Sequence, residues 1–337
     1  MKKKILILGG GGFIGANLAS YISARYDCNL TLADYRFGRD MASYVDVDKT
    51  KFITADFTLP NSFSLLETDY DHVYMLASIV GVNNTIERPD SVIRVNSKLI
   101  LNTLDWLDSS SVSKVLFSST SETYSATTEL FNHPIPTAED VPVSISDTKD
   151  PRFSYAVTKI LGESGFLNAA KGSGYRATIV RYHNAFGPDM GFKHVIPHLV
   201  ERFASGEKPF RVYGHDQTRA FSYISDTVRG TLMAMESEEA DGEVIHIGTD
   251  VEISIEQLVK EVGKLMGYRG EYVPAETYPG SVNRRCPDIG KARRLLGYEP
   301  EVDWRSGLAT TVKWYEAFFH ENLKPTSDGF IPRENFN

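Results

Sequence analysis

A glycine-rich turn near the start of the chain constrains the fold more than any other feature. The apolar run at residues 5–8 ends at four consecutive glycines, and apolar residues four apart follow it. A buried strand, a tight turn and an amphipathic helix in this order begin a nucleotide-binding β-α-β unit. The glycines let backbone N–H groups approach a pyrophosphate, and the helix N-terminus favours its charge. We therefore expect a dinucleotide at Gly9, Gly12, Phe13, Ile14 and Gly15.

Two acidic residues follow the next apolar runs. Asp34 ends the run at residues 30–34, where a carboxylate accepts hydrogen bonds from the adenosine ribose. Because this carboxylate repels a 2′-phosphate, we expect NAD rather than NADP, although Arg36 and Arg39 lie close by. Asp56 follows the third run and either contacts adenine or is a solvated loop carboxylate.

The order of apolar runs predicts the fold class. Further buried runs at 30–34, 51–54, 72–76, 115–117 and 177–182 alternate with helical patterns. This alternation predicts an α/β fold with a Rossmann-type doubly wound parallel sheet. After residue 188 the pattern is irregular, with short strands expected at 210–213 and 243–247, which predicts a smaller mixed α/β C-terminal lobe. The expected division is residues 1–180 for dinucleotide binding and catalysis, 181–322 mainly for the substrate lobe, and 323–337 as a tail.

Composition and charge exclude several classes of protein. The 337 residues are 42% hydrophobic with a net charge of −8, which is typical of a packed globular protein and unfavourable for nucleic-acid binding. No stretch approaches the ~18 apolar residues of a membrane span, so we expect a cytoplasmic protein with no membrane partner. Cys28 and Cys286 suggest neither a disulfide nor structural zinc. His183, His194 and His198 lack the further ligand that would complete a metal site, so no metal is expected.

A tyrosine and a lysine four residues apart form the candidate catalytic pair. Tyr155 and Lys159 share one helical face, in the only Tyr-x-x-x-Lys of the chain. A phenol removes the proton of an alcohol well only if its pKa falls from about 10. A neighbouring Lys⁺ and a cationic nicotinamide both favour the phenolate, so we expect the pKa of Tyr155 to be lowered. Thr120 and Glu122 follow a strand of the predicted sheet at the edge where ligands bind, and Thr120 is placed to hydrogen-bond the reacting oxygen.

The chain resembles the extended short-chain dehydrogenase/reductase family, specifically its nucleotide-sugar epimerases, dehydratases and decarboxylases. The resemblance extends to about residue 320 and rests on the glycine loop, Asp34, residues 120–122, Tyr155 with Lys159, and segments 181–188, 212–219 and 284–288. It implies a tightly held NAD that is reduced and reoxidised within one turnover. It also implies a nucleoside-diphosphate sugar bound through Asn184, Arg219 and Arg285, and a homodimer formed by the helices near 92–107 and 152–170. His183 stands where the family commonly has phenylalanine.

The residues and the resemblance together predict an enzyme that oxidises C4 of a nucleotide sugar, acts on the ketone and returns the hydride. Tyr155 is the expected base, Lys159 holds the nicotinamide ribose, and Thr120 orients the hydroxyl. Glu122 is either a second base at C5, which the ketone acidifies, or a structural carboxylate that caps a turn. The net reaction is open between 4,6-dehydration, decarboxylation and C5 epimerisation. The alternatives are a simple 4-epimerase, a net dehydrogenase or reductase that releases NADH, and a non-catalytic NAD-binding sensor.

Overall fold

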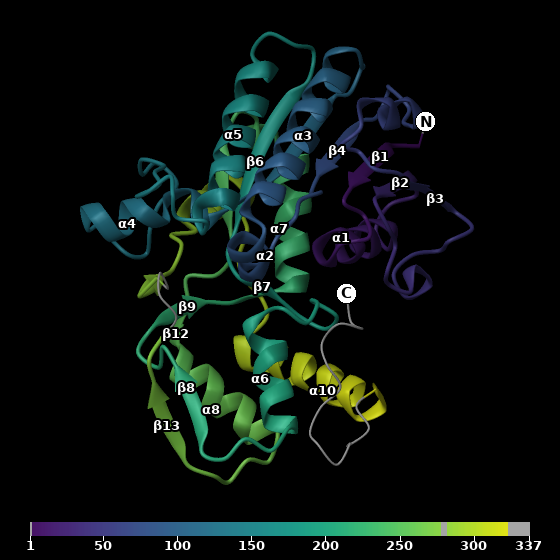
Figure 1. Ribbon diagram of the computed structural model, residues 1–337. Helices are drawn as coiled ribbons and strands as arrows, with labels where there is room; N and C mark the ends of the chain where they lie inside the picture. Colours follow the sequence, from purple (N-terminus) through teal and green to yellow (C-terminus); the bar gives the residue numbers. More distant parts are fainter. Residues whose placement is uncertain (1, 278–281, 323–337) are drawn as a thin grey trace.

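A seven-stranded parallel sheet forms the centre of the larger half of the molecule (Figure 1). The computed structural model describes residues 2–277 and 282–322. The strand order is β11-β6-β5-β4-β1-β2-β3, and every neighbouring pair is parallel. The order reverses between β1 and β4, as in doubly wound folds, which confirms the predicted fold class. The strands are β1 (Lys4–Leu8), β2 (Asn29–Asp34), β3 (Thr50–Thr54), β4 (His72–Met75), β5 (Lys114–Thr120), β6 (Arg176–Tyr182) and β11 (Val244–Ile247).

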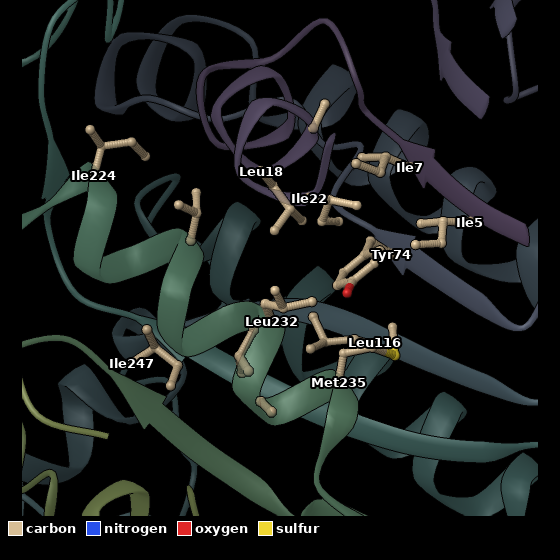
Figure 2. Close-up of a cluster of buried hydrophobic side chains, with 14 of the residues drawn as sticks. Ile5, Ile7, Leu18, Ile22, Tyr74, Leu116, Ile224, Leu232, Met235 and Ile247 are labelled. Atoms are coloured by element: carbon tan, nitrogen blue, oxygen red, sulfur yellow. The ribbon is translucent and has the colours of Figure 1, made fainter. Parts of the chain in front are cut away.

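Helices cover both faces of this sheet, because the strands are apolar on both sides. On one face α1 (Phe13–Ser23) and α7 (Ile224–Glu236) pack onto alternate strand residues such as Ile5 and Ile7, as Figure 2 shows. On the other face α3 (Pro89–Asp108) and α5 (Phe153–Ala170) pack onto the intervening residues, such as Leu6 and Leu8. Because neighbouring strands of this sheet are parallel, their carboxyl ends lie at one edge, where the loops that follow them form the site.

A second, smaller half lies below the carboxyl ends of the strands and has its own apolar core (Figure 1). Its helices are α6 (Val195–Ala204), α8 (Ile255–Leu265) and α10 (Trp304–Asn322), and its strands are β7 (Ala185–Phe186), β8 (Phe210–Tyr213), β9 (Thr218–Ala220), β10 (Ser222–Tyr223), β12 (Glu252–Ser254), β13 (Tyr272–Ala275) and β14 (Arg284–Arg285). The remaining helices are α2 (Val82–Glu87), α4 (Ser125–Phe131) and α9 (Gly290–Leu296), with 3-10 turns η1 (Met41–Ser43), η2 (Pro60–Leu65), η3 (Ser121–Tyr124) and η4 (Glu238–Ala240).

The structure corrects one expectation about the lobe. The strand at 243–247 does not belong to the smaller half: as β11 it pairs with β6 and completes the main sheet. The helix before it, α7, packs beside α1 on the same sheet. The chain therefore returns to the first half after residue 181, and the division at residue 180 stays a prediction. The expected tail at 323–337 lies outside the described residues.

The helix that carries Tyr155 begins later than its sequence indicates. Asp150 and Pro151 suggest an N-cap and first helical residue, but α5 starts at Phe153. The Asp150 carboxylate instead accepts a hydrogen bond from the Arg152 backbone N–H at 2.9 Å, inside a turn that precedes the helix.

In the part of the chain that the structure describes, none of the helices combines the length and apolar character needed to cross a bilayer.

Candidate active site

The glycine loop lies between β1 and α1, and its shape depends on missing side chains. Gly9 has a positive φ of 90°, and a Cβ there would lie 2.6 Å from the Ala77 backbone nitrogen. A Cβ on Gly15 would lie 2.1 Å from the Gly9 carbonyl oxygen. Gly12 caps α1 without a side-chain hydrogen bond to its first turn. The first-turn N–H groups, beginning at Phe13 and Ile14, therefore face a cradle that fits a pyrophosphate.

Asp34 closes this cradle from the end of β2. Its carboxylate accepts a hydrogen bond from the Gly11 backbone N–H at 2.9 Å. Burial raises the pKa of Asp34, while hydrogen bonds from Gly11 and Arg36 oppose the shift. Arg39 donates to the Gly11 carbonyl at 3.1 Å and forms an ion pair with Asp189 at 2.9 Å. Because these contacts hold the Arg39 side chain, it does not reach out to bind a 2′-phosphate. An unphosphorylated ribose is therefore favoured at Asp34.

Asp56 has a structural partner. Its carboxylate accepts a hydrogen bond from the Thr58 backbone N–H at 2.9 Å, and the residue is half-buried after β3. The carboxylate therefore caps a turn, and its contact with adenine stays a prediction.

Tyr155 and Lys159 lie side by side on α5, next to the end of β5. The Lys159 ammonium lies 5.4 Å from the centre of the Tyr155 ring. It donates a hydrogen bond to the Ser118 carbonyl at 2.8 Å, and only 2% of the lysine is exposed. Burial lowers the pKa of Lys159 to about 7, and Glu163 opposes the shift. The lysine is therefore held at a fixed point beneath the tyrosine, with a charge that depends on pH near neutrality.

The expected lowering of the Tyr155 pKa is not produced by the protein's own groups. Burial raises the pKa of Tyr155, Glu122 raises it further, and a hydrogen bond with Ser78 lowers it. Without nicotinamide, removal of the phenol from water is the largest influence on its pKa, so the lowered pKa expected with the coenzyme bound stays a prediction. A neutral phenol gives a proton, whereas only the phenolate takes one, so Tyr155 must ionise before it acts as a base.

Glu122 stands at the centre of a group of arginines. It lies in η3, two positions after Thr120, and forms an ion pair with Arg285 of β14. Burial by itself raises the pKa of Glu122, but Arg285, Arg152 and Arg219 together hold it below its usual value. Burial also lowers the pKa of Arg219 to about 10, and Arg285 adds to that shift. The structure therefore brings Glu122, Arg219 and Arg285 together, and Glu122 is ionised at neutral pH.

Two predicted site residues, Thr120 and Asn184, form hydrogen bonds within the protein. The Thr120 hydroxyl accepts a weak hydrogen bond from the Glu122 backbone N–H at 3.3 Å and caps η3. Asn184 has a positive φ of 39°, and its amide donates to the Ala220 carbonyl at 2.8 Å. This bond ties the start of the lobe to β9, beside Arg219. The roles of Thr120 and Asn184 toward a substrate stay predictions.

Sequence reasoning did not assign two residues of this site. Ser78 follows the end of β4 and lowers the pKa of Tyr155. Arg152 precedes α5 and acts on both Glu122 and Arg219. The available signal for Ser78 was its position after the carboxyl end of a sheet strand, where ligands bind. Within the described ranges, no three His, Cys, Asp or Glu side chains gather as a metal site would require.

This sheet carries a nucleotide cradle, a Tyr-x-x-x-Lys pair and a charged edge for the substrate. Together these features are typical of enzymes that use NAD in oxidation and reduction. The chain belongs to the NAD dependent epimerase/dehydratase family, whose model matches residues 5–248. It is 33% identical over 325 residues to the UDP-N-acetyl-alpha-D-glucosaminuronate decarboxylase of Bacillus cytotoxicus, covering 94% of this chain and 98% of the relative.

Two solved structures extend the comparison. The UDP-glucose 4-epimerase of Thermotoga maritima, with UDP-glucose, has a TM-score of 0.81 at 27% identity and covers 94% of this chain and 99% of its own. The UDP-glucuronic acid 4-epimerase of Bacillus cereus, in complex with UDP-glucuronic acid and NAD, has a TM-score of 0.79 at 25% identity, with coverage of 94% and 99%. The chain is therefore an NAD-dependent enzyme that modifies nucleotide sugars, as the sequence predicted.

Proposed function

We propose that the chain decarboxylates a nucleoside-diphosphate uronic acid, in which C6 of the sugar is a carboxylate. The observation that carries the proposal is the group of three arginines, Arg152, Arg219 and Arg285, around the ionised Glu122, whose charge also acts on Tyr155. In a chain with a net charge of −8, this place holds a local surplus of positive charge. A substrate with both a diphosphate and a sugar carboxylate supplies the anions that such a surplus binds.

Each residue of the site has its own role in the proposed reaction. NAD, when bound at Gly9–Gly15 and Asp34, supplies the acceptor and later the donor of a hydride at sugar C4. Tyr155, as the phenolate that a bound nicotinamide cation would favour, takes the proton of the C4 hydroxyl, and Thr120 orients that hydroxyl. The resulting 4-ketone is a β-keto acid, so the bond from C5 to the carboxyl carbon breaks and its electrons pass to the C4 oxygen. Tyr155 and Thr120 then stabilise that oxygen by hydrogen bonds.

The negative charge of the Glu122 carboxylate determines which role this residue can take in the reaction. An ionised carboxylate cannot donate the proton that C5 needs after carbon dioxide leaves. It can hold the Arg285 guanidinium against the sugar and orient a water molecule toward C5. As C4 is reduced, Tyr155 gives its proton to the C4 oxygen, which yields a pentose and restores the enzyme.

The relatives support a uronic acid substrate. The decarboxylase from Bacillus cytotoxicus is named for an N-acetylated uronate, and the Bacillus cereus structure holds UDP-glucuronic acid. The second of these is named as a 4-epimerase, which makes C4 epimerisation of the same kind of substrate the second candidate function. The two reactions share the oxidation at C4 and differ in whether the carboxylate leaves.

Mass spectrometry of the products tests the proposal. The enzyme is incubated in deuterated water with UDP-glucuronate, UDP-N-acetylglucosaminuronate and, as a neutral control, UDP-glucose. We expect loss of the mass of carbon dioxide with one deuterium gained at C5, from a uronate only. An unchanged mass with an altered C4 configuration would instead establish the epimerase. Loss of water, or turnover of UDP-glucose alone, would contradict a uronate decarboxylase.

The predicted homodimer is part of the proposal. Four apolar side chains of the adjacent helices α3 and α5 are exposed, namely Ile93, Leu101, Val157 and Leu161, by 38–49%. An apolar patch across two neighbouring helices is typical of a protein interface. We expect sedimentation to show a dimer, which Leu101→Glu disrupts and the matched surface change Leu65→Glu does not. A monomeric wild type would exclude the dimer. The cytoplasmic location stays a prediction.

A further inference from the structure

We propose that a buried chain of three aromatic side chains, Tyr124, His183 and His246, positions the Glu122–Arg285 ion pair. The role of that pair in the reaction rests on the proposed function, whereas the chain itself rests on contacts in the structure. Each of the three residues is at most 2% exposed. They are positioning residues, because they act through Glu122 and Arg285 rather than on the sugar.

The three side chains connect the two elements that carry the ion pair. Tyr124 is the last residue of η3, two positions after Glu122, and its hydroxyl lies 3.1 Å from His183 Nε2. The ring centres of His183 and His246 are 4.8 Å apart, at 70° to each other. His246 Nδ1 lies 3.2 Å from the carbonyl oxygen of Asp288, three positions after Arg285. A contact path thus runs from one partner of the ion pair to the other.

The last contact of the chain fixes the tautomer of His246. The Asp288 carbonyl only accepts, so His246 Nδ1 carries its proton and His246 Nε2 is bare. Among the described residues, His246 Nε2 and His183 Nδ1 are both buried and without a hydrogen-bond partner. Because these two atoms make no direct hydrogen bond, a proton on His183 Nδ1 completes the chain through one water. His183 Nε2 is then an acceptor, and the Tyr124 hydroxyl donates to it.

The opposite tautomer of His183 is unfavourable. It would put the proton on His183 Nε2 and leave the hydrogen of the buried Tyr124 hydroxyl without an acceptor, because His183 Nε2 is its hydrogen-bond partner among the described residues. Both histidines are neutral in either case: burial lowers the pKa of His183 well below its usual value and that of His246 to about 3. One arrangement of protons is therefore preferred, and it holds the three rings in one geometry.

The surroundings hold the two ends of the chain in place. The Arg181 guanidinium lies 5.5 Å from the centre of the Tyr124 ring. The His246 backbone N–H donates to the Glu139 carboxylate at 2.8 Å. The segment after Arg285 is fixed by backbone bonds from Thr137 to Cys286 and from Asp288 to Thr137, at 2.9 and 2.8 Å. A shift of either end therefore changes the separation of Glu122 and Arg285.

Steady-state kinetics with single and double variants test the proposal. Tyr124→Phe removes one hydroxyl, and His183→Phe removes both nitrogens at similar volume. We expect each to lower kcat about tenfold with KM changed less than about twofold, because positioning acts on the reacting geometry. The double variant should be no slower than the slower single variant, since both break one chain. His183→Gln, which keeps an acceptor for Tyr124, should recover part of the loss.

Matched controls separate positioning from stability. His72 and Tyr74 are also buried and each has a polar atom without a partner among the described residues, but they lie in β4, away from the ion pair. His72→Phe and Tyr74→Phe should leave kcat within about twofold of wild type. Equal losses of kcat in the control and chain variants, or chain variants that only lower the unfolding temperature, would overturn the proposal.

Histidine NMR gives a readout that does not depend on turnover. With ¹⁵N-labelled histidine in the holoenzyme, we expect both His183 and His246 as neutral Nδ1–H tautomers between pH 6 and 8. Tyr124→Phe should move the Nε2 shift of His183 alone. An Nε2–H tautomer of His183 would overturn the proposal. All variants are assayed on whichever nucleotide sugar the wild type turns over, so failure of the decarboxylase proposal leaves this test intact.

Discussion

The coenzyme side and the substrate side of the site are built by different means. On the coenzyme side Gly9, Gly12, Gly15 and Asp34 lie within one β-α-β unit, and they work through backbone groups and the absence of Cβ atoms. On the substrate side the charged residues come from η3, the start of α5, β9 and β14, and work through side chains. The first kind of binding is local in the sequence and sterically strict. The second depends on pairs of charges far apart in the chain.

The largest effect should come from the residue where the two sides meet. Tyr155→Phe removes the group that exchanges a proton with the C4 oxygen, so kcat should fall about 10³-fold, while affinities for NAD and sugar nucleotide stay close to wild type. Stopped-flow measurement of NADH absorbance and binding titrations check both statements. The buried Tyr70→Phe is the matched control. A variant that retains a tenth of wild-type activity would refute the assignment of Tyr155.

Two of the glycines should differ in what an added Cβ disturbs. At Gly15 it disturbs the fold of the loop, and at Gly12 it disturbs the approach of NAD. A Cβ on Gly15 meets backbone at 2.1 Å, so Gly15→Ala should lower both the unfolding temperature of NAD-free protein and NAD affinity, the latter about 10- to 100-fold. A Cβ on Gly12 meets only the Gly9 oxygen, at 3.2 Å. Gly12→Ala should therefore weaken NAD binding about tenfold with little change in unfolding. Calorimetric titration and thermal unfolding measure these effects, with Gly172→Ala as control because no atom lies within 4 Å of its added Cβ. Unchanged NAD affinity in both variants would contradict the cradle.

Removal of one arginine on the substrate side should make kcat/KM depend more strongly on pH. In the wild type Glu122 has a lowered pKa, so it stays ionised from pH 7.5 down to pH 5.5. In Arg285→Gln the burial that raises this pKa has less opposition, and the active carboxylate is lost as pH falls through the new value. We expect kcat/KM at pH 5.5, relative to pH 7.5, to drop about tenfold more than in wild type.

The neighbour of Arg285 provides the control for this pH profile. Arg284 pairs with Glu252 at 2.7 Å and is half exposed, so Arg284→Gln should retain the wild-type profile. Parallel pH profiles for wild type and Arg285→Gln would show that Glu122 does not depend on Arg285.

The smallest effect should be one of stability, at Lys159. Its pKa is lowered to about 7 in the folded chain, so between pH 7 and about 10.5 the unfolded chain binds more protons and wild-type stability rises with pH. Lys159→Met removes a buried charge that costs most below pH 7. In NAD-free protein the variant should be more stable by about 1–3 kcal/mol at pH 6, and the difference should shrink by pH 9. Chemical denaturation measures this, with the exposed Lys149→Met as control, and a difference independent of pH would contradict the lowered pKa.

The same contrast explains how much could be predicted from the sequence. The strands at 5–8 and 30–34, the glycine cradle and Asp34 are local patterns, and the structure has them where they were expected. The strand at 243–247 was assigned to the wrong half because a short apolar run does not reveal its neighbour, here β6, 65 residues earlier. The start of α5 was misplaced because Asp-Pro also begins a turn.

The charged contacts were harder to predict than the strands. Glu122 and Arg285 were both singled out, but their ion pair joins positions 163 residues apart. No spacing rule predicts such a pair. The raised pKa of Tyr155 could not be predicted either, because it depends on how deeply the fold buries the phenol.

One isotope measurement tests the central claim that the site removes a hydride from C4 and returns it. The substrate is the uronate nucleotide carrying deuterium at C4, turned over by the holoenzyme in ordinary water without added NAD. We predict a product lighter by the mass of carbon dioxide that keeps the deuterium at C4, together with a slowed rate of hydride transfer. A product with ordinary hydrogen at C4, or decarboxylation with no isotope effect and no transient NADH, would contradict the account.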